Sequence, residues 1–200
     1  MSQFAEKTSL PVQAQVEALT AVAKKLNGEG KEAQALEAYK TASGLMPGAP
    51  WLQHRTAELA RKLKQPEAAA LHYRRAAVAF ISAGFPKRAL APLRMAWQVS
   101  IALLPHDTSG FITVALELAN VQRELGFPAD AKLTQNNSNQ ALRSSGSSER
   151  VPTAAEFELR STRASQNPDA AQPPESGVKS LAPPASSSGI LSRLQAAVKG

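Results

Sequence analysis

The side chains with the greatest potential for chemistry are cations gathered in one stretch of the chain. Between residues 55 and 94, nine basic residues are opposed only by Glu58 and Glu67. The nine are Arg55, Arg61, Lys62, Lys64, Arg74, Arg75, Lys87, Arg88 and Arg94. This stretch accounts for the formal net charge of +7 of the whole chain, so an anionic partner is expected to bind here rather than elsewhere. The alternative is an ordinary solvated surface.

Sequence patterns for catalysis, metal binding and nucleotide binding are lacking. The three histidines, His54, His72 and His106, never stand four residues apart, so no metal site is predicted. The stretch GEGKEA at 28–33 lacks the first glycine and the Ser or Thr of a phosphate-binding loop. There is no cysteine, which excludes thiolate catalysis and disulfides. We therefore expect a protein that is not an enzyme and that has no catalytic residue, cofactor, metal or small-molecule substrate.

The elements that must position the cations are predicted to be helices. Glycine and proline divide the chain into seven helical stretches, near 11–26, 31–45, 51–64, 67–83, 86–104, 111–125 and 128–143, with Ser9 as the cap of the first. Alternating β-branched runs, which would indicate strands, are missing from the sequence. Hydrophobic residues make up 43% and aromatic residues only 5%, so the core is expected to consist largely of Ala, Leu and Val. The last stretch is polar and is either a terminal cap or frayed.

One pattern recurs at an interval of 34 residues. Its copies are Ala35, Tyr39 and Ala42, and then Ala69, Tyr73 and Ala76. The spacing Ala-x3-Tyr-x2-Ala, followed in the first copy by Pro47, resembles the second half of the tetratricopeptide repeat (TPR), best over residues 16–83. Upstream, the second copy departs from the pattern, with Gln53 and Thr56 where the repeat has Trp and Leu. The resemblance implies a TPR-like right-handed α-solenoid of about seven antiparallel helices.

The same residues have a physical meaning that does not depend on the family. Helices approach closely only where small residues face each other. We expect such contacts at Ala23, Ala35 and Ala42 in one hairpin, and at Ala57, Ala69 and Ala76 in the next. Tyr39 and Tyr73 would then fill the space between successive hairpins. Because no hairpin buries its apolar face alone, the hairpins are predicted to stack.

Gly-Phe-Pro occurs twice, at 84–86 and 126–128. Gly84 and Gly126 are predicted to end a helix in the left-handed conformation. Phe85 and Phe127 would pack back on the preceding turn, and Pro86 and Pro128 would begin the next helix. The tripeptide therefore indicates a repeated helix boundary rather than a ligand loop.

The resemblance also implies a function and a binding site. In tetratricopeptide proteins the first helix of each hairpin lines a concave groove that binds a partner peptide or helix. Carried over by position, the groove would contain Lys24, Asn27, Trp51, His54, Arg55, Arg61, Lys62, Arg88 and Arg94. We expect a cytoplasmic, bacterial interaction scaffold or adaptor that favours an acidic protein partner. The alternative is a nucleic-acid-associated protein that uses the basic 55–94 surface, although few aromatic residues interleave there for base stacking.

The domain organisation follows from changes in composition. We predict a flexible segment at 1–10, the helical repeat domain at 11–143, a disordered Ser-, Pro- and Ala-rich linker at 144–188 and a short amphipathic motif at 189–200. Ile190, Leu191, Leu194 and Val198 fall on one face of that motif. It is expected either to dock on a partner or to fold back on the helical domain. Neither a secretion signal nor a membrane span is predicted from the sequence.

Overall fold

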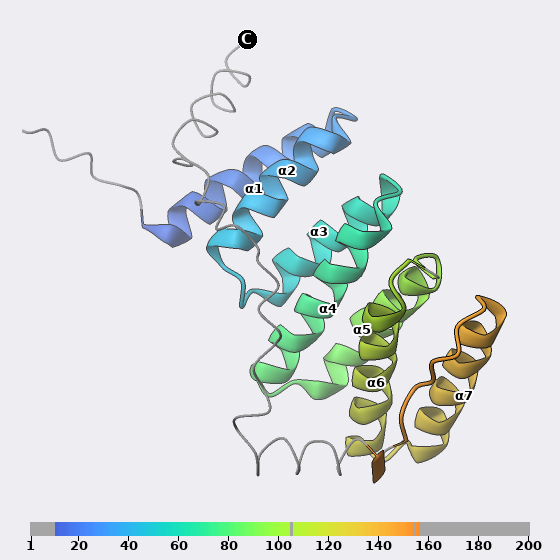
Figure 1. The fold of residues 1–200 in the computed structure, drawn as a ribbon. Coiled ribbons are helices and arrows are strands. Elements are labelled where there is room, and N and C mark those ends of the chain that lie inside the picture. The colour runs from blue at the N-terminus through green and yellow to red at the C-terminus, as the bar shows by residue number, and fades with distance from the viewer. Residues whose placement is uncertain (1–10, 105, 154, 157–200) are drawn as a thin grey trace, which may run out of the picture. The chain divides into compact units, whose positions relative to one another are not determined.

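Seven helices follow one another along the part of the chain that the structure describes (Figure 1). The computed structural model describes residues 11–104, 106–153 and 155–156. The helices are α1 (Val12–Gly28), α2 (Glu32–Leu45), α3 (Pro50–Lys62), α4 (Pro66–Ser82), α5 (Pro86–Ile101), α6 (Thr108–Glu124) and α7 (Pro128–Ser144). Within these ranges there is no strand, and the main contacts join helices that are neighbours in sequence. The predicted all-α solenoid is confirmed for the described residues.

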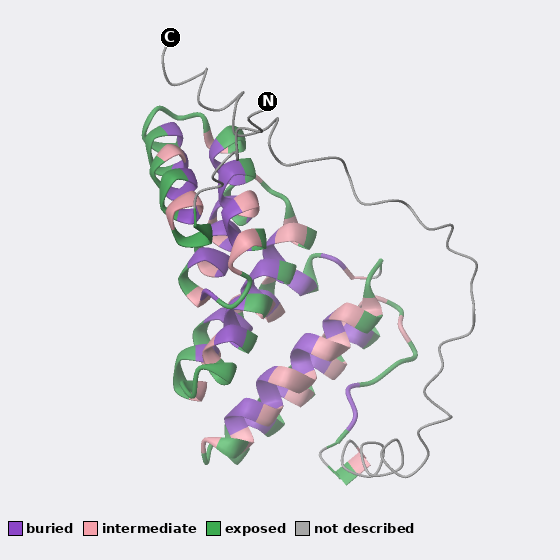
Figure 2. Cartoon of the chain, turned by 90° about the vertical axis from the view of Figure 1, so that its left-hand side faces the viewer, coloured by how far each residue is buried: buried purple, intermediate pink, exposed green. Residues whose placement is uncertain are grey.

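Alanines lie at the places where helices approach each other most closely. The six alanines that were expected to set the helix spacing have no exposed surface; they are Ala23, Ala35, Ala42, Ala57, Ala69 and Ala76. Tyr39 and Tyr73 are buried beside them. Each helix turns its buried residues toward its neighbours and its exposed residues toward solvent (Figure 2). A larger side chain at such an alanine would overpack the contact and separate the helices.

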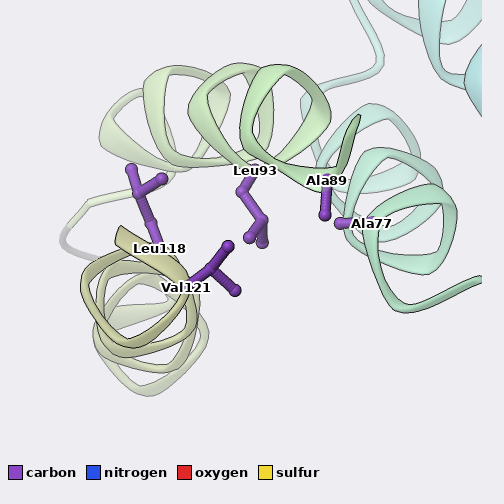
Figure 3. Packing of buried hydrophobic residues seen from close by; sticks show 5 residues of the cluster. All are labelled: Ala77, Ala89, Leu93, Leu118 and Val121. Carbon is purple, nitrogen blue, oxygen red and sulfur yellow. The ribbon is translucent and has the colours of Figure 1, made fainter. Parts of the chain in front are cut away.

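The contact of α4, α5 and α6 illustrates this packing (Figure 3). Ala77 of α4 meets Ala89 of α5, where two small side chains let the helices come close. Leu93 of α5 then reaches toward α6 and packs with Leu118 and Val121. Ala89 and Leu93, four residues apart on one face of α5, therefore join α5 to both α4 and α6.

Several helices end in the same backbone motif. Gly84, just past α4, has φ +80°, and its N–H donates to the carbonyl of Ile81 at 2.9 Å. The Phe85 N–H donates to the carbonyl of Phe80, also at 2.9 Å. Gly126 repeats this geometry after α6 with φ +83°. These paired bonds satisfy carbonyl groups that a helix end leaves without partners.

Phe85 and Phe127, the middle residues of the two Gly-Phe-Pro turns, are half-buried, at 50% and 46% exposed. The backbone bonds close the turns, and the guanidinium of Arg88 lies over the Phe85 ring, 5.0 Å from its centroid. Pro86 and Pro128 are the first residues of α5 and α7, where a helix needs no N–H.

The polar helix α7 is held by hydrogen bonds as well as by apolar contacts. The Trp97 indole donates to the Ser138 hydroxyl at 2.8 Å, and Ser138 donates to the carbonyl of Thr134 at 2.7 Å. The Thr134 hydroxyl donates to Oε1 of Gln122 on α6 at 2.9 Å. Small residues at this seam let α7 lie close to α6. Its polar sequence is therefore compatible with an ordered terminal helix.

The packed chain extends beyond the boundary that we expected at Arg143. After α7 the chain continues to Val151, which is 2% exposed and packs with Phe111 and Leu142. The Val151 N–H donates to Oδ1 of Asn139 at 2.7 Å. The compact helical unit accordingly ends at Val151. The composition change near residue 144 gave no sign of this, because one apolar residue makes the contact.

Some predicted features lie at the margins of the described chain. Ser9, the expected cap of the first helix, lies outside the described residues, as do residues 157–188 of the expected linker. The cap of α6 is Asp107, whose Oδ1 accepts from the Gly110 N–H at 2.8 Å. Across the described ranges, none of the helices has the length and apolar character needed to cross a membrane.

The turn after α3 differs from the others and gives a first prediction. Lys64 has φ +55° where the turns after α4 and α6 have glycine, and its N–H makes the same bond, to the carbonyl of Arg61. Because a side chain disfavours this conformation, Lys64→Gly should raise the free energy of unfolding by about 0.5–1 kcal/mol in urea titrations. Gly84→Ala should lower it by a similar amount, since open space surrounds that glycine and only the backbone is affected. A loss of stability in Lys64→Gly would contradict this.

Candidate functional site

A cavity of about 330 Å³ opens between the first three helices. Lys24 and Asn27, in the last two turns of α1, line one side, and Tyr39 contributes from α2. The α3 side is formed by Arg55, Glu58, Leu59 and Lys62. Because α2 packs against both α1 and α3, both helices can contribute to the same cavity.

The charges of the cavity are predominantly positive. Arg55 Nη1 lies 2.9 Å from Oε2 of Glu58, and Lys62 pairs with Glu32 of α2. Lys24 makes no ion pair within the described ranges. The Arg55 and Lys62 side chains are 66% and 62% exposed, so their pairs contribute little to stability and both cations stay accessible to a ligand. The cavity therefore presents three cations, one amide and one carboxylate.

Tyr39 supplies a rigid apolar surface within the cavity. The residue is largely buried, and burial raises the pKa of its hydroxyl, while nearby Arg55 acts weakly in the opposite direction. The hydroxyl therefore stays protonated at neutral pH and can donate a hydrogen bond. Leu59 adds an aliphatic side chain. A ligand that enters would meet apolar surface as well as cations.

Gln53 fixes α3 relative to α2 and α4. Its Nε2 donates to the carbonyls of Ser43 and Pro47, at 3.2 and 3.3 Å. Its Oε1 lies 2.8 Å from Nδ1 of His72. Since the amide nitrogen already donates twice, Oε1 must accept, and His72 therefore carries its proton on Nδ1. One buried amide on α3 thus joins the end of α2, the following turn and α4.

His72 is held in its neutral form. Burial, together with the nearby cations Arg75 and Lys40, lowers the pKa of the imidazole to about 4. Neutral His72 donates to Gln53 and requires no counter-ion. The stability of the Gln53–His72 contact therefore depends on the protonation of His72, which does not affect the surface ion pairs.

The cavity unites some of the nine predicted groove residues. Lys24, Asn27, Arg55 and Lys62 line it. Trp51 lies on the same face of α3 as Arg55, one turn earlier, and is 49% exposed. The other four, His54, Arg61, Arg88 and Arg94, do not line it.

Helix geometry explains why His54 and Arg61 are displaced. Arg55, Glu58 or Leu59, and Lys62 follow the spacing of one helix face. His54 does not line the cavity: its ring contacts the Tyr73 ring edge-on, with centroids 5.5 Å apart, and its Nδ1 lies 3.8 Å from Oε1 of the lining residue Glu58. Arg61 is exposed beside the cavity without lining it.

Arg88 and Arg94 belong to α5, which does not contribute to the cavity. Tyr39 and Leu59, which also line the cavity, were not among the predicted groove residues. Tyr39 was read only as a spacer between hairpins, and the helical spacing of Leu59 with Arg55 and Lys62 was the available signal.

The basic stretch 55–94 is partly neutralised by residues far away in sequence. Arg74 Nε donates to both carboxylate oxygens of Glu117 on α6, at 2.8 and 2.9 Å. Lys62 pairs with Glu32. A count of charges in the stretch alone could not find these partners. The free positive charge is smaller and more localised than the composition suggests.

None of the remaining predicted features lies at this cavity within the described residues. Ile190, Leu191, Leu194 and Val198 lie outside the described residues. In the described ranges, no group of three His, Asp or Glu side chains is placed to hold a metal ion.

Comparisons with known proteins leave the family open. No protein-family model matches the chain, and no curated protein matches its sequence. Among solved structures, the crystal structure of BtubC (BKLC) from P. vanneervenii is similar, with a TM-score of 0.45 and 16% sequence identity. The similarity covers 90% of this chain and 75% of that chain. No functional conclusion follows from a likeness at this level.

The His72 junction gives a prediction of pH dependence. The pKa of the folded state, about 4, lies below the ordinary value of about 6.5, so the unfolded chain binds the proton more readily between these values. The free energy of unfolding should therefore be highest above pH 6.5 and fall toward pH 4, by at most about 3 kcal/mol from this residue. Chemical denaturation of wild type and His72→Gln across this range tests it. An equally steep acid loss in the variant would show that other groups are responsible.

Proposed function

We propose that the chain is a non-enzymatic, tetratricopeptide-like interaction module that binds an acidic peptide segment of a partner protein. The observation that carries this proposal is the cavity of about 330 Å³ with Lys24, Arg55 and Lys62 around it. Its single lining carboxylate, Glu58, is already paired with Arg55. A bacterial, cytoplasmic setting belongs to the same proposal and rests on sequence composition.

The lining suits a peptide in particular. The cations attract Asp and Glu side chains, and the Asn27 amide can both donate to and accept from a peptide backbone. Tyr39 and Leu59 offer apolar surface to the side chains between the acidic residues. Trp51, exposed one turn away on α3, extends this surface with an aromatic ring.

A nucleic acid fits this site less well. Base stacking needs aromatic faces along a positively charged path, and the cavity offers only Tyr39, which is largely buried. Arg74 is held by Glu117, which interrupts the positive charge along the basic stretch. These features favour the acidic peptide.

The proposal predicts how charge changes alter binding of a fluorescent hexaglutamate peptide, measured by anisotropy. The double variant Lys24→Glu/Arg55→Glu should weaken binding at least about tenfold, because two attractions become repulsions. Glu58→Gln should strengthen binding, because it removes the lining carboxylate and frees Arg55. Added salt should weaken the binding of wild type.

A matched control is available on α7. Lys132→Glu/Arg143→Glu makes the same change in net charge at exposed positions away from the cavity, and it should leave peptide affinity nearly unchanged. Equal losses in the two double variants would mean that only net charge matters, and the cavity would not be the site. Tighter binding of a single-stranded oligonucleotide, unaffected by Lys24→Glu/Arg55→Glu, would favour the nucleic-acid alternative.

A further inference from the structure

A second cavity, of about 150 Å³, opens where α4, the end of α5 and the start of α6 meet. It lies at the opposite end of these helices from the contact of Ala77 with Ala89 (Figure 3). Glu67 and Leu71, which line it, are exposed, so a ligand can enter from solvent. Pockets for small molecules measure roughly 300–1,000 Å³, and this smaller cavity therefore suits a single side chain rather than a peptide segment. It shares no residue with the cavity between α1, α2 and α3.

The lining of this second cavity carries excess negative charge. Its cation, Arg74, donates from Nε to both carboxylate oxygens of Glu117, at 2.8 and 2.9 Å, and is thereby neutralised. Two further carboxylates, those of Glu67 and Asp107, line the cavity and make no ion pair with any described residue. Although the formal net charge of the chain is +7, this cavity is therefore expected to attract a cation.

The first turn of α6 fixes the position of the Asp107 carboxylate. Its Oδ1 accepts from the Gly110 N–H at 2.8 Å. A Cβ atom at position 110 would collide with this carboxylate, so glycine, a poor helix former, leaves the room that the acid needs. A carboxylate offers about four acceptor positions. Because the helix start uses one of them, Asp107 can also accept from a ligand.

Ser100 gives an independent indication of a polar ligand. The residue lines the cavity, and only 3% of its surface is exposed. Its hydroxyl makes no hydrogen bond with any described residue, and the oxygen is not fully enclosed by protein atoms. Buried hydroxyls are normally paired, because a missing partner costs stability. A ligand in the cavity can supply that partner.

We propose that this cavity binds a primary ammonium group at the end of an aliphatic chain, the group that a lysine side chain of a partner protein carries. Glu67 of α4, Ser100 of α5 and Asp107 before α6 supply acceptors from three elements. An ammonium group has three N–H donors and can bond to all three acceptors, whereas the donors of a guanidinium lie in one plane. The aliphatic chain would lie against the apolar part of the lining, which consists of Ala70, Leu71, Leu103 and Val114.

An anion fits this cavity less well. The two features that would attract one are the Arg74 guanidinium and the start of α6, and each is already paired with a carboxylate, from Glu117 and Asp107. The charge of Glu67 remains uncompensated and would repel an anion. A free alkylamine has the same chemistry as a lysine side chain, so the experiment distinguishes these two sources.

The experiment follows ¹H–¹⁵N correlation spectra of the full chain during titration with Nα-acetyl-lysine methylamide, whose only charge is its ammonium group. Saturable shifts are expected at residues 67–74 and 107–114. The norleucine analogue has the same aliphatic chain without the ammonium group and should bind at least about tenfold more weakly. Tighter binding of a lysine-containing pentapeptide than of n-butylamine would identify a protein side chain as the ligand, and the reverse order a free amine.

Matched variants locate the binding site of the lysine derivative. Glu67→Gln/Asp107→Asn removes both charges, while asparagine still caps α6, and should weaken binding at least about tenfold. Glu124→Gln/Asp130→Asn makes the same change at exposed positions outside the cavity and should leave the affinity nearly unchanged. Ser100→Ala should weaken binding several-fold without lowering the free energy of unfolding, because the hydroxyl has no partner within the described chain.

Several results would overturn the inference. They are the absence of saturable shifts at the lining residues, equal affinity for the lysine and norleucine derivatives, and equal losses in the two carboxylate variants. Binding of inorganic phosphate that shifts the same residues and is lost in Arg74→Gln would assign the cavity to an anion instead. Lys24→Glu/Arg55→Glu should leave binding of the lysine derivative unchanged, so this inference and the proposed function can fail independently.

Discussion

The close approach of helices at alanine contacts is the constraint on which the rest of the structure depends. Where Ala23, Ala35 and Ala42 lose all exposed surface, α1 and α2 pack closely enough for Tyr39 to reach the cavity beside Lys24. The second set of alanines, 34 residues further on, orders α3 and α4 in the same way. Because an alanine leaves no room for adjustment, the spacing of two helices is set by the alanines packed between them. The geometry of the cavity therefore depends on one or two such contacts.

The features that could be predicted are those that depend on neighbours in sequence. Helix boundaries followed from glycine and proline, since Gly84 and Gly126 take a conformation that other residues adopt at a cost. The alanine and tyrosine repeat pointed to a stack of helical hairpins. Within the candidate site, Lys24, Asn27, Arg55 and Lys62 were expected from the resemblance to the tetratricopeptide repeat, and these four residues line the cavity.

What the sequence did not reveal depends on contacts between distant residues. Gln53 joins α2, α3 and α4 through hydrogen bonds to the carbonyl of Ser43 and to His72, which lie in different helices. The partners of Arg74 and Lys62 come from other helices, and Val151 fills a site between α6 and α7 from within a polar segment. Arg88 and Arg94, which belong to α5, do not line the cavity between α1, α2 and α3.

The account assigns the basic cavity between α1, α2 and α3 to an acidic peptide. Its central claim is tested most directly by ¹H–¹⁵N correlation spectra of the full chain during titration with hexaglutamate. The account predicts that the largest saturable shifts fall at Lys24–Gly28 and at Arg55–Lys62. Shifts centred on residues 75–88 instead, or small shifts spread evenly over all lysine and arginine positions, would contradict it.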